Sequence, residues 1–349
     1  MRKFLLSLVF TLVPALVPAE EITVIAAGDV YLGGRAAPFI ERNGPSYPFA
    51  FTADIFGEGD MVIVNLESPL TEREKAFMEK EYVFKAGAGA AEALKAGGVD
   101  VATLANNHIM DYGAAGLGDT MARLDGLGIA HGGAGRTLEE ARRPAVVEIK
   151  GVKVAVLAYS NTLPEEFYAG KRSPGTAYGR PEHVRADVRK AAGEADIVIV
   201  SFHWSEEGLK EPKDYQRELA HTAIDSGARL VLGHHPHVVQ GAEFYNDGLI
   251  LYSLGNFVFG SYSLKGPEGI IARVVFTEDG SVKSAGVIPI DVDNWEVDFR
   301  PAPLGGEVAL DLSGGLKGAG VSRLPPPLPR TPPRTPKPGR VGGEVVLAP

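Results

Sequence analysis

The sequence contains no cysteine. Disulfide frameworks, thiolate nucleophiles, cysteine-ligated zinc and iron–sulfur clusters are therefore excluded together. An excess of positive charge is also lacking, because 35 lysine and arginine residues stand against 44 aspartate and glutamate residues, a net charge of −9. We therefore expect no nucleic acid partner bound through overall positive charge. A bound metal would need histidine, aspartate, glutamate, asparagine or water as ligands.

Apolar runs long enough to span a bilayer are lacking after the N-terminal segment. Residues 1–19 themselves have the pattern of a secretory signal peptide: basic Arg2 and Lys3, an apolar run from Phe4 to Val17, and the small residue Ala19 before an acidic pair. The alternative is an uncleaved membrane anchor, which would need about 20 apolar residues without the break at Pro14. We expect an extracytoplasmic protein, whether secreted, periplasmic, at the cell surface or membrane-anchored.

Residues 301–349 form a basic tail rich in proline and glycine. Between Pro325 and Pro338, eight of fourteen residues are proline. Such a segment lacks the backbone donors and apolar side chains of a core, so we expect it to be disordered. It is interpreted either as a contact to an anionic wall polymer or lipid surface, or as a tether without specific function.

Residues 20–300 alternate between short apolar runs and helical patterns, which predicts an α/β domain whose strands are buried on both faces. The predicted strands are Ile22 to Ala27, Met61 to Leu66, Val99 to Leu104, Val152 to Tyr159, Ile197 to Phe202 and Arg229 to Leu232. The predicted helices are Ala90 to Ala96, Leu117 to Leu127, Pro181 to Glu194 and Pro212 to Ser226. After residue 237 two hairpins are expected, at Ala242 to Leu254 and Gly269 to Ile290, forming a second, more antiparallel sheet.

Polar side chains follow most of these strands at the point where each ends. The segments are Gly28-Asp29, Asn65-Leu66-Glu67-Ser68, Asn106-Asn107-His108, His203-Trp204 and Gly233-His234-His235-Pro236-His237. Ligands of open α/β sheets bind outside the carboxyl ends of the strands. Taken singly, an aspartate after a strand is more often a helix cap, and a histidine beside a tryptophan is more often packing. Together, imidazoles with carboxylates and carboxamides predict a metal site suited to manganese, zinc or iron rather than calcium.

These segments, with Asp111 and the run Tyr252-Ser253-Leu254-Gly255-Asn256-Phe257, resemble the CapA-type poly-γ-glutamate capsule-synthesis proteins. The resemblance covers roughly residues 21 to 260. That family is related to the calcineurin-like metallophosphoesterases, so the resemblance implies a four-layer sandwich of two mixed β-sheets flanked by helices.

The resemblance also implies roles for individual residues. Asp29 would ligate a first metal, Glu67 would stand at the bridging position, and Asn107 would ligate a second metal. His203, His235 and His237 would complete the ligands, with His235 and His237 divided between the two ions. His108 would protonate the leaving oxygen, and Asp111 would orient its ring. His234 fits no ligand position and is interpreted as a flanking residue.

The sequence departs from the wider superfamily at two positions. Tyr31 stands where a first-site histidine is usual, and Glu67 replaces a shorter aspartate. One metal or two therefore both agree with the sequence. Three hypotheses follow: a metal-dependent hydrolase acting on a phosphate ester or other bond, a non-catalytic component of capsule polymer export, and a wall-associated protein that binds an anionic polymer. The machinery of capsule synthesis at the membrane is the expected setting.

Overall fold

The computed structural model describes residues 21–261 and 266–312. The expected signal peptide at 1–19 and the tail from residue 313 lie outside the described residues. Among those described, no helix has the length and apolar character needed to cross a bilayer.

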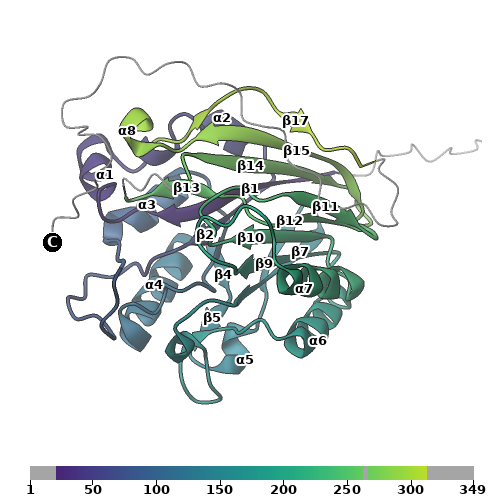
Figure 1. The fold of residues 1–349 in the computed structure, drawn as a ribbon, viewed down its shortest axis with the longest axis horizontal. Coiled ribbons are helices and arrows are strands. Elements are labelled where there is room, and N and C mark those ends of the chain that lie inside the picture. Colours follow the sequence, from purple (N-terminus) through teal and green to yellow (C-terminus); the bar gives the residue numbers. More distant parts are fainter. Residues whose placement is uncertain (1–20, 262–265, 313–349) are drawn as a thin grey trace, which may run out of the picture.

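Two mixed β-sheets face each other at the centre of the molecule (Figure 1). The first has nine strands: β1 (Ile22–Tyr31), β2 (Met61–Leu66), β3 (Val101–Thr103), β4 (Ala130–Gly132), β13 (Asn256–Phe259), β14 (Glu268–Phe276), β15 (Val282–Asp291), β16 (Ala302–Pro303) and β17 (Val308–Ala309). The second has six: β6 (Ala145–Ile149), β7 (Val152–Ser160), β9 (Ile197–His203), β10 (Leu230–His234), β11 (Ala242–Tyr245) and β12 (Gly248–Leu251). A small third sheet pairs β5 (Ala134–Gly135) with β8 (Gly175–Thr176).

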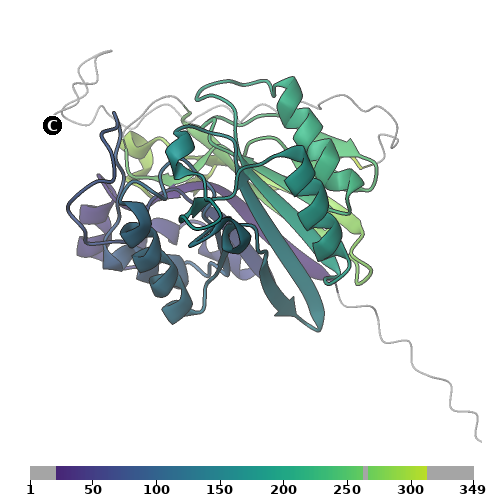
Figure 2. The ribbon, with the colours of Figure 1, turned by 90° about the horizontal axis from the view of Figure 1, so that it is seen from below.

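Helices cover the outer faces of both sheets, so the molecule has four layers (Figure 2). Those packed on the first sheet are α1 (Ala37–Asn43), α2 (Ala53–Gly57), α3 (Ala88–Ala96) and α4 (Gly113–Leu127). Those packed on the second are α6 (Pro181–Ala192) and α7 (Asp214–Asp225). Short helices at α5 (Leu138–Ala141), α8 (Asn294–Val297), η1 (Tyr47–Phe49) and η2 (Glu165–Phe167) lie in the connections. The predicted four-layer sandwich is confirmed.

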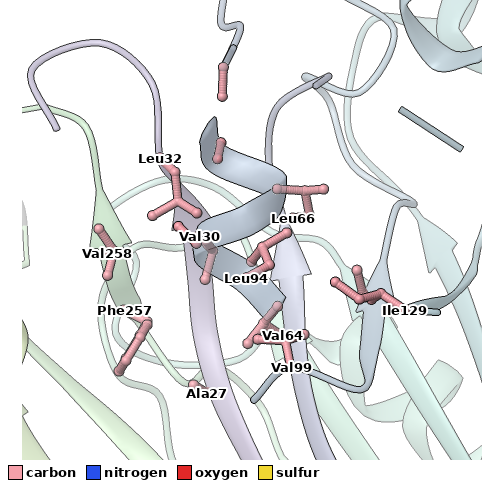
Figure 3. Close-up of a cluster of buried hydrophobic side chains, with 14 of the residues drawn as sticks. Ala27, Val30, Leu32, Val64, Leu66, Leu94, Val99, Ile129, Phe257 and Val258 are labelled. Carbon is pink, nitrogen blue, oxygen red and sulfur yellow. The ribbon is translucent and has the colours of Figure 1, made fainter. Parts of the chain in front are cut away.

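Three apolar cores account for the continuous apolar strands. Along β1, Ile25 and Ala27 pack toward the helices on one face, whereas Val24 and Ala26 pack between the sheets. Successive side chains of a strand point to opposite faces, so a strand covered on both faces needs apolar residues at every position. Figure 3 shows the helix-side core, in which Leu94 of α3 lies against the strand residues. Each such buried aliphatic side chain contributes about 2 kcal/mol relative to an exposed one.

The predicted strands, helices and hairpins are present, but the predicted division into a first-half and a second-half sheet is wrong. The hairpin β11–β12 extends the second sheet through β10, and the hairpin β14–β15 joins the first sheet beside β1. The six earlier strands are likewise split between the two sheets. Strand pairing joins segments more than 200 residues apart in the sequence. The hydrophobic pattern of a strand does not indicate which other strand pairs with either of its edges.

The first sheet also continues beyond residue 300, where we expected the tail to begin. Strand β16 pairs with β15 at Pro303 and Ile290, and β17 pairs with β15 at Val308 and Val287. Leu310 and Leu312 pack against the core between the sheets. These residues therefore belong to the fold, because they cover apolar surface that β15 leaves open.

Candidate metal centre

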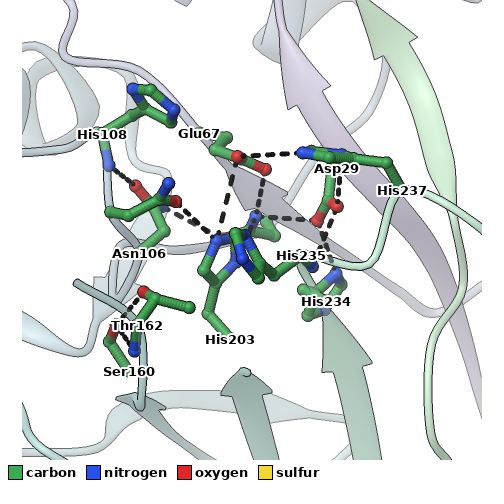
Figure 4. A network of polar contacts seen from close by, with 12 residues as sticks. Asp29, Glu67, Asn106, His108, Ser160, Thr162, His203, His234, His235 and His237 are labelled. Atoms are coloured by element: carbon green, nitrogen blue, oxygen red, sulfur yellow. Dashed lines mark hydrogen bonds and ion pairs between the residues drawn. The ribbon is translucent and has the colours of Figure 1, made fainter. Parts of the chain in front are cut away.

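The candidate metal centre lies at the carboxyl ends of four strands, two from each sheet (Figure 4). Asp29 lies near the end of β1 and Glu67 directly follows β2, so the first sheet supplies carboxylates. His203 ends β9, His234 ends β10, and the loop at residues 235–237 follows, so the second sheet supplies imidazoles. The predicted convergence of strand ends is confirmed.

The register of the paired strands places these side chains at the same edge of the two sheets. Asp29 pairs with Asn65 of β2, and His203 pairs with His234 of β10. The Glu67 amide donates to the Val30 carbonyl at 2.8 Å, which fixes the turn where β2 ends. Neighbouring parallel strands in register deliver equivalent positions to the same edge, here from two sheets that face each other.

Two groups of side chains in the described part of the chain have metal-ligand geometry. Glu67, His203 and His235 form one group, and Asp29, Glu67 and His237 form the other, with the ligand atoms of each within 4.8 Å of one another. Glu67 belongs to both. The arrangement is compatible with the bridging position that the resemblance gives to Glu67, and with the division of His235 and His237 between two ions.

Burial of the two carboxylates fits a bound cation. The side chains of Asp29 and Glu67 are fully buried, and Glu67 Oε1 has no hydrogen-bond partner. Burial raises the pKa of Glu67 well above its usual range, and the nearby Asp29 charge raises it further. A buried carboxylate oxygen without a partner is costly unless a positive charge lies against it. The donor set of carboxylates and imidazoles fits a divalent transition metal.

The histidines differ in charge. Burial lowers the pKa of His203 well below its usual value and that of His235 to about 3, so both rings are neutral, which is the form that binds metal. Burial alone would lower the pKa of His237, but the charge of Glu67 and a contact with Asp29 outweigh it and raise the pKa to about 9. Without a metal, His237 therefore supplies the positive charge that these carboxylates need.

The loop after β10 has an unusual backbone. His235 has φ 92° and His237 has φ 56°, both in the region that residues other than glycine rarely adopt. Pro236 lies between them and stiffens the loop. The His235 amide donates to Asp29 Oδ2 at 3.1 Å, which holds the loop against β1. Such strain costs about 1–3 kcal/mol per residue and is concentrated at functional sites.

Four residues outside the predicted ligand set hold the ligands in place. Asn65 Nδ2 donates to Asp29 Oδ1 at 2.9 Å, and Asn106 Nδ2 donates to Asn65 Oδ1 at 3.1 Å. His237 Nδ1 lies 2.8 Å from Asn256 Oδ1, which leaves Nε2 facing Glu67. His234, interpreted from sequence as a flanking residue, is instead buried with Nδ1 at 3.0 Å from Asp29 Oδ1. Burial alone would raise the pKa of Asp29, but His234 and His237 hold it well below its usual range.

His108 lies beside the cluster in a second polar group. Its Nδ1 lies 2.8 Å from Asp111 Oδ2, the orienting contact that the resemblance implies. The ring stacks on Phe84 at 3.8 Å between centroids. Burial lowers the pKa of His108, although the contact with Asp111 opposes this.

Lys80 is a member of this group that the sequence did not single out. Its Nζ donates to Asp111 Oδ1 at 2.7 Å and to the Asn107 carbonyl at 2.6 Å. Asp111 is fully buried, so Lys80 balances its charge. Lys80 lies in a long loop without a periodic pattern, and its sequence neighbours Glu79 and Glu81 make it resemble an ordinary surface charge.

Two further predicted positions are explained by contacts. Asn107 Oδ1 lies 2.8 Å from His203 Nε2, which brings Asn107 to the cluster as expected. Tyr31, where the superfamily usually has a histidine, is buried and stacks on Phe84 at 4.3 Å between centroids. Phe259 packs edge-on against the same ring. Tyr31 thus has a packing role here, and the imidazoles beside Asp29 are those of His234 and His237.

The fold, two mixed sheets flanked by helices, is metallophosphoesterase-like. NAD nucleotidase from Haemophilus influenzae has the same fold, with a TM-score of 0.50 and 12% sequence identity, over 79% of this chain and 51% of that one.

Within that fold, the chain belongs to the bacterial capsule synthesis protein PGA_cap family, whose family model matches residues 23–261. Capsule biosynthesis protein CapA of Bacillus anthracis is 31% identical over 280 residues, covering 78% of this chain and 68% of the relative. PGA biosynthesis protein CapA of Bacillus subtilis is 32% identical over 287 residues, covering 82% and 74%. A probable polyglutamine synthesis accessory protein of Mycobacterium tuberculosis is 33% identical over 256 residues, covering 68% and 67%.

Proposed function

We propose that this protein is a metal-dependent hydrolase of the phosphoesterase type that acts outside the cytoplasm in the synthesis or export of a poly-γ-glutamate capsule. The observation that carries the proposal is the buried Glu67 carboxylate, which two ligand groups share beside His108. The family supports the capsule setting, and the N-terminal pattern of the sequence supports the location.

The metal would be held by Asp29, Glu67 and the three histidines of the two groups, with Asn107 at their edge. When bound, divalent ions supply positive charge that stabilises a developing oxyanion and that acidifies water at neutral pH. Manganese, zinc and iron all suit this donor set.

The chain's own contribution to the reaction is proton transfer and orientation. His108 would give a proton to the leaving oxygen, since its Nδ1 is held by Asp111 and its other nitrogen is left for the substrate. Asp111 stabilises the protonated ring, and Lys80 fixes Asp111. Stacking on Phe84 sets the plane of the imidazole.

Turnover tests this proposal. Phosphomonoesters, phosphodiesters and γ-glutamyl amides should be assayed with manganese, zinc or iron, comparing the wild type with the His203→Ala/His235→Ala double variant. We expect hydrolysis of a phosphate ester by the wild type alone. His131→Ala is a matched control, because His131 contacts Asp125 away from the cluster and should leave the rate unchanged.

A non-catalytic role in polymer export is the second candidate, favoured by Tyr31 at the usual position of a ligand. If no ester or amide is turned over with any of these metals, while poly-γ-glutamate binds the wild type and not the double variant, this second role replaces hydrolysis.

A further inference from the structure

A hollow of about 820 Å³ opens beside the metal centre and reaches His235. His235 is only 9% exposed, it lines the hollow, and its Nδ1 has no hydrogen-bond partner. The volume falls within the range of pockets that hold small molecules. The hollow is therefore placed to hold the part of a substrate that lies next to the reacting group.

The loop between β9 and α7 forms one wall. The Gly208 amide donates to the Pro236 carbonyl at 2.8 Å, which ties this loop to the strained loop that carries His235. The Ser205 amide donates to the Tyr215 hydroxyl at 2.6 Å, which ties it to α7. The wall is thus fixed relative to the metal centre by hydrogen bonds at both of its sides.

The lining is acidic. It contains the carboxylates of Glu206, Glu207 and Glu218 and one ammonium group, that of Lys213. Lys213 pairs with Glu206, so its charge is already balanced within the lining. Glu207 and His235 line the same hollow.

Other residues of the lining are aromatic or apolar. Tyr178 lines the hollow and packs at a tilt against Tyr168, with 4.5 Å between ring centroids. Leu163 lies at the rim and is 74% exposed, which is unusual for leucine. A lining with both apolar side chains and carboxylates suits a short chain that ends in a cation, because the chain can pack on the tyrosine and leucine while the cation meets the carboxylates.

We propose that this hollow binds an ammonium group on the alcohol side of a phosphate ester, while the phosphoryl group lies at the metal centre. Only the position of the phosphoryl group in this inference rests on the proposed function. A chain of glutamate carboxylates is disfavoured in this hollow, because it would place like charges against Glu207 and Glu218.

Paired probes of equal length test this. Binding of 6-aminohexyl phosphate and hexyl phosphate to the full-length, manganese-loaded protein should be compared by calorimetry. We expect the amine to bind about tenfold more tightly, since each of the two exposed carboxylates, those of Glu207 and Glu218, should contribute about threefold to fivefold. The advantage should shrink at high salt, which screens exposed charges.

Substitutions of the lining carboxylates show which of them cause the preference for the amine. Glu207→Gln and Glu218→Gln should each reduce the ratio of the two affinities, amine over hexyl phosphate, by about threefold to fivefold. Glu194→Gln removes the same charge from an exposed position beyond the end of α6 and serves as the matched control, with an unchanged preference.

A second pair of probes separates this inference from the proposed function. Hexylamine and hexanol carry no phosphate, so their binding, followed by NMR chemical shifts of the protein, does not depend on hydrolysis. Tighter binding of hexylamine, weakened by the Gln variants, supports the site even if no ester is turned over. Equal binding of the two, or displacement of hexylamine by poly-γ-glutamate through direct competition in the hollow, would overturn it.

Discussion

His108 and its partners form a layered arrangement in which each residue fixes the next. Lys80 balances Asp111, Asp111 holds His108 Nδ1, and Phe84 supports the ring while its amide donates to Asp111 Oδ2 at 2.6 Å. None of these contacts involves the two candidate metal-ligand groups. Loss of proton transfer and loss of metal are therefore separable by substitution.

Removal of the His108 side chain should lower the rate of phosphate ester hydrolysis and leave the metal content unchanged. His108→Ala should lower phosphoesterase activity by roughly 10²–10⁴-fold, the usual contribution of a general acid. The loss should be smaller for aryl phosphates, whose leaving groups depart without protonation. Rates with alkyl and aryl substrates, together with metal content, measure this, and an equal loss for both substrate classes would contradict the role.

Lys80 gives a second test at the same scale. Lys80→Met leaves the buried Asp111 without its cation, and we expect the free energy of unfolding to fall by about 3 kcal/mol. Lys80→Arg keeps the charge and should recover most of that loss. Urea denaturation of both variants measures the difference. If the two variants are equally stable, the ion pair with Asp111 does not contribute to the free energy of unfolding.

Single residues also show the limit of the sequence. The ligand types were predictable because Asp29, Glu67 and the histidines each end a strong apolar run. The supporting residues were not, because an asparagine such as Asn256 is recognised only through the side chain that it contacts. His237 lies 19 positions earlier in the chain, and nothing local connects the two.

At the scale of elements, close packing of backbone sets the position of the ligands. Gly28 precedes Asp29 on β1, where β13 approaches so closely that an added Cβ atom would lie 2.0 Å from the Gly255 carbonyl oxygen. The Asp29 amide donates to that same oxygen at 3.0 Å. The contact needs a glycine because no side chain fits between the two backbones.

A substitution at Gly28 should therefore disturb the site through the strand. Gly28→Ala should force β1 and β13 apart, lower the stability and weaken metal binding. Gly118→Ala is the control, because Gly118 lies on an exposed face of α4 with nothing near the added atom, and it should stabilise by about 0.5–1 kcal/mol. Thermal unfolding and metal titration compare them. Normal metal affinity in Gly28→Ala would show that β1 tolerates the shift.

The existence of the strands and helices was predictable from the sequence, whereas the pairing of strands was not. Burial of β1 on both faces needs only a continuous run of apolar residues, which the sequence displays. Its partner β14 begins more than 200 residues later, and the choice between two sheets depends on packing of the whole chain. Residues 302–309 were wrongly assigned to the tail for the same reason, since their few apolar side chains stabilise the fold only by packing against β15.

At the scale of the whole molecule, two sheets bring buried carboxylates and imidazoles together, and the balance of charge depends on pH. His237 has a folded pKa of about 9 against about 6.5 unfolded, so it stabilises the metal-free protein below pH 6.5 and loses that effect as the pH rises to 9. The raised pKa of Glu67 acts in the same direction. His203 and His235 have lowered pKa values, so their contribution is present above pH 6.5 and is lost in acid.

The metal-free protein should consequently be most stable near pH 6.5. Urea midpoints measured in EDTA should fall between pH 6.5 and 9, and saturating manganese should remove this decline because the ion replaces the proton of His237. His237→Gln should also flatten the alkaline side. A constant midpoint from pH 6.5 to 9 in EDTA would contradict the assigned charge of His237.

The central claim is that strand ends of both sheets form a metal centre, and elemental analysis tests it most directly. Protein equilibrated with manganese or zinc at pH 9 and freed of excess ion should retain at least one ion per chain, with weaker binding as the pH falls below about 9, because the ion must then displace the proton of His237. His235→Ala should lose most of the metal, and the His203→Ala/His235→Ala double variant should lose it while its circular dichroism stays that of the wild type. An unchanged metal stoichiometry in the folded double variant would contradict the account, because the cluster would then be structural.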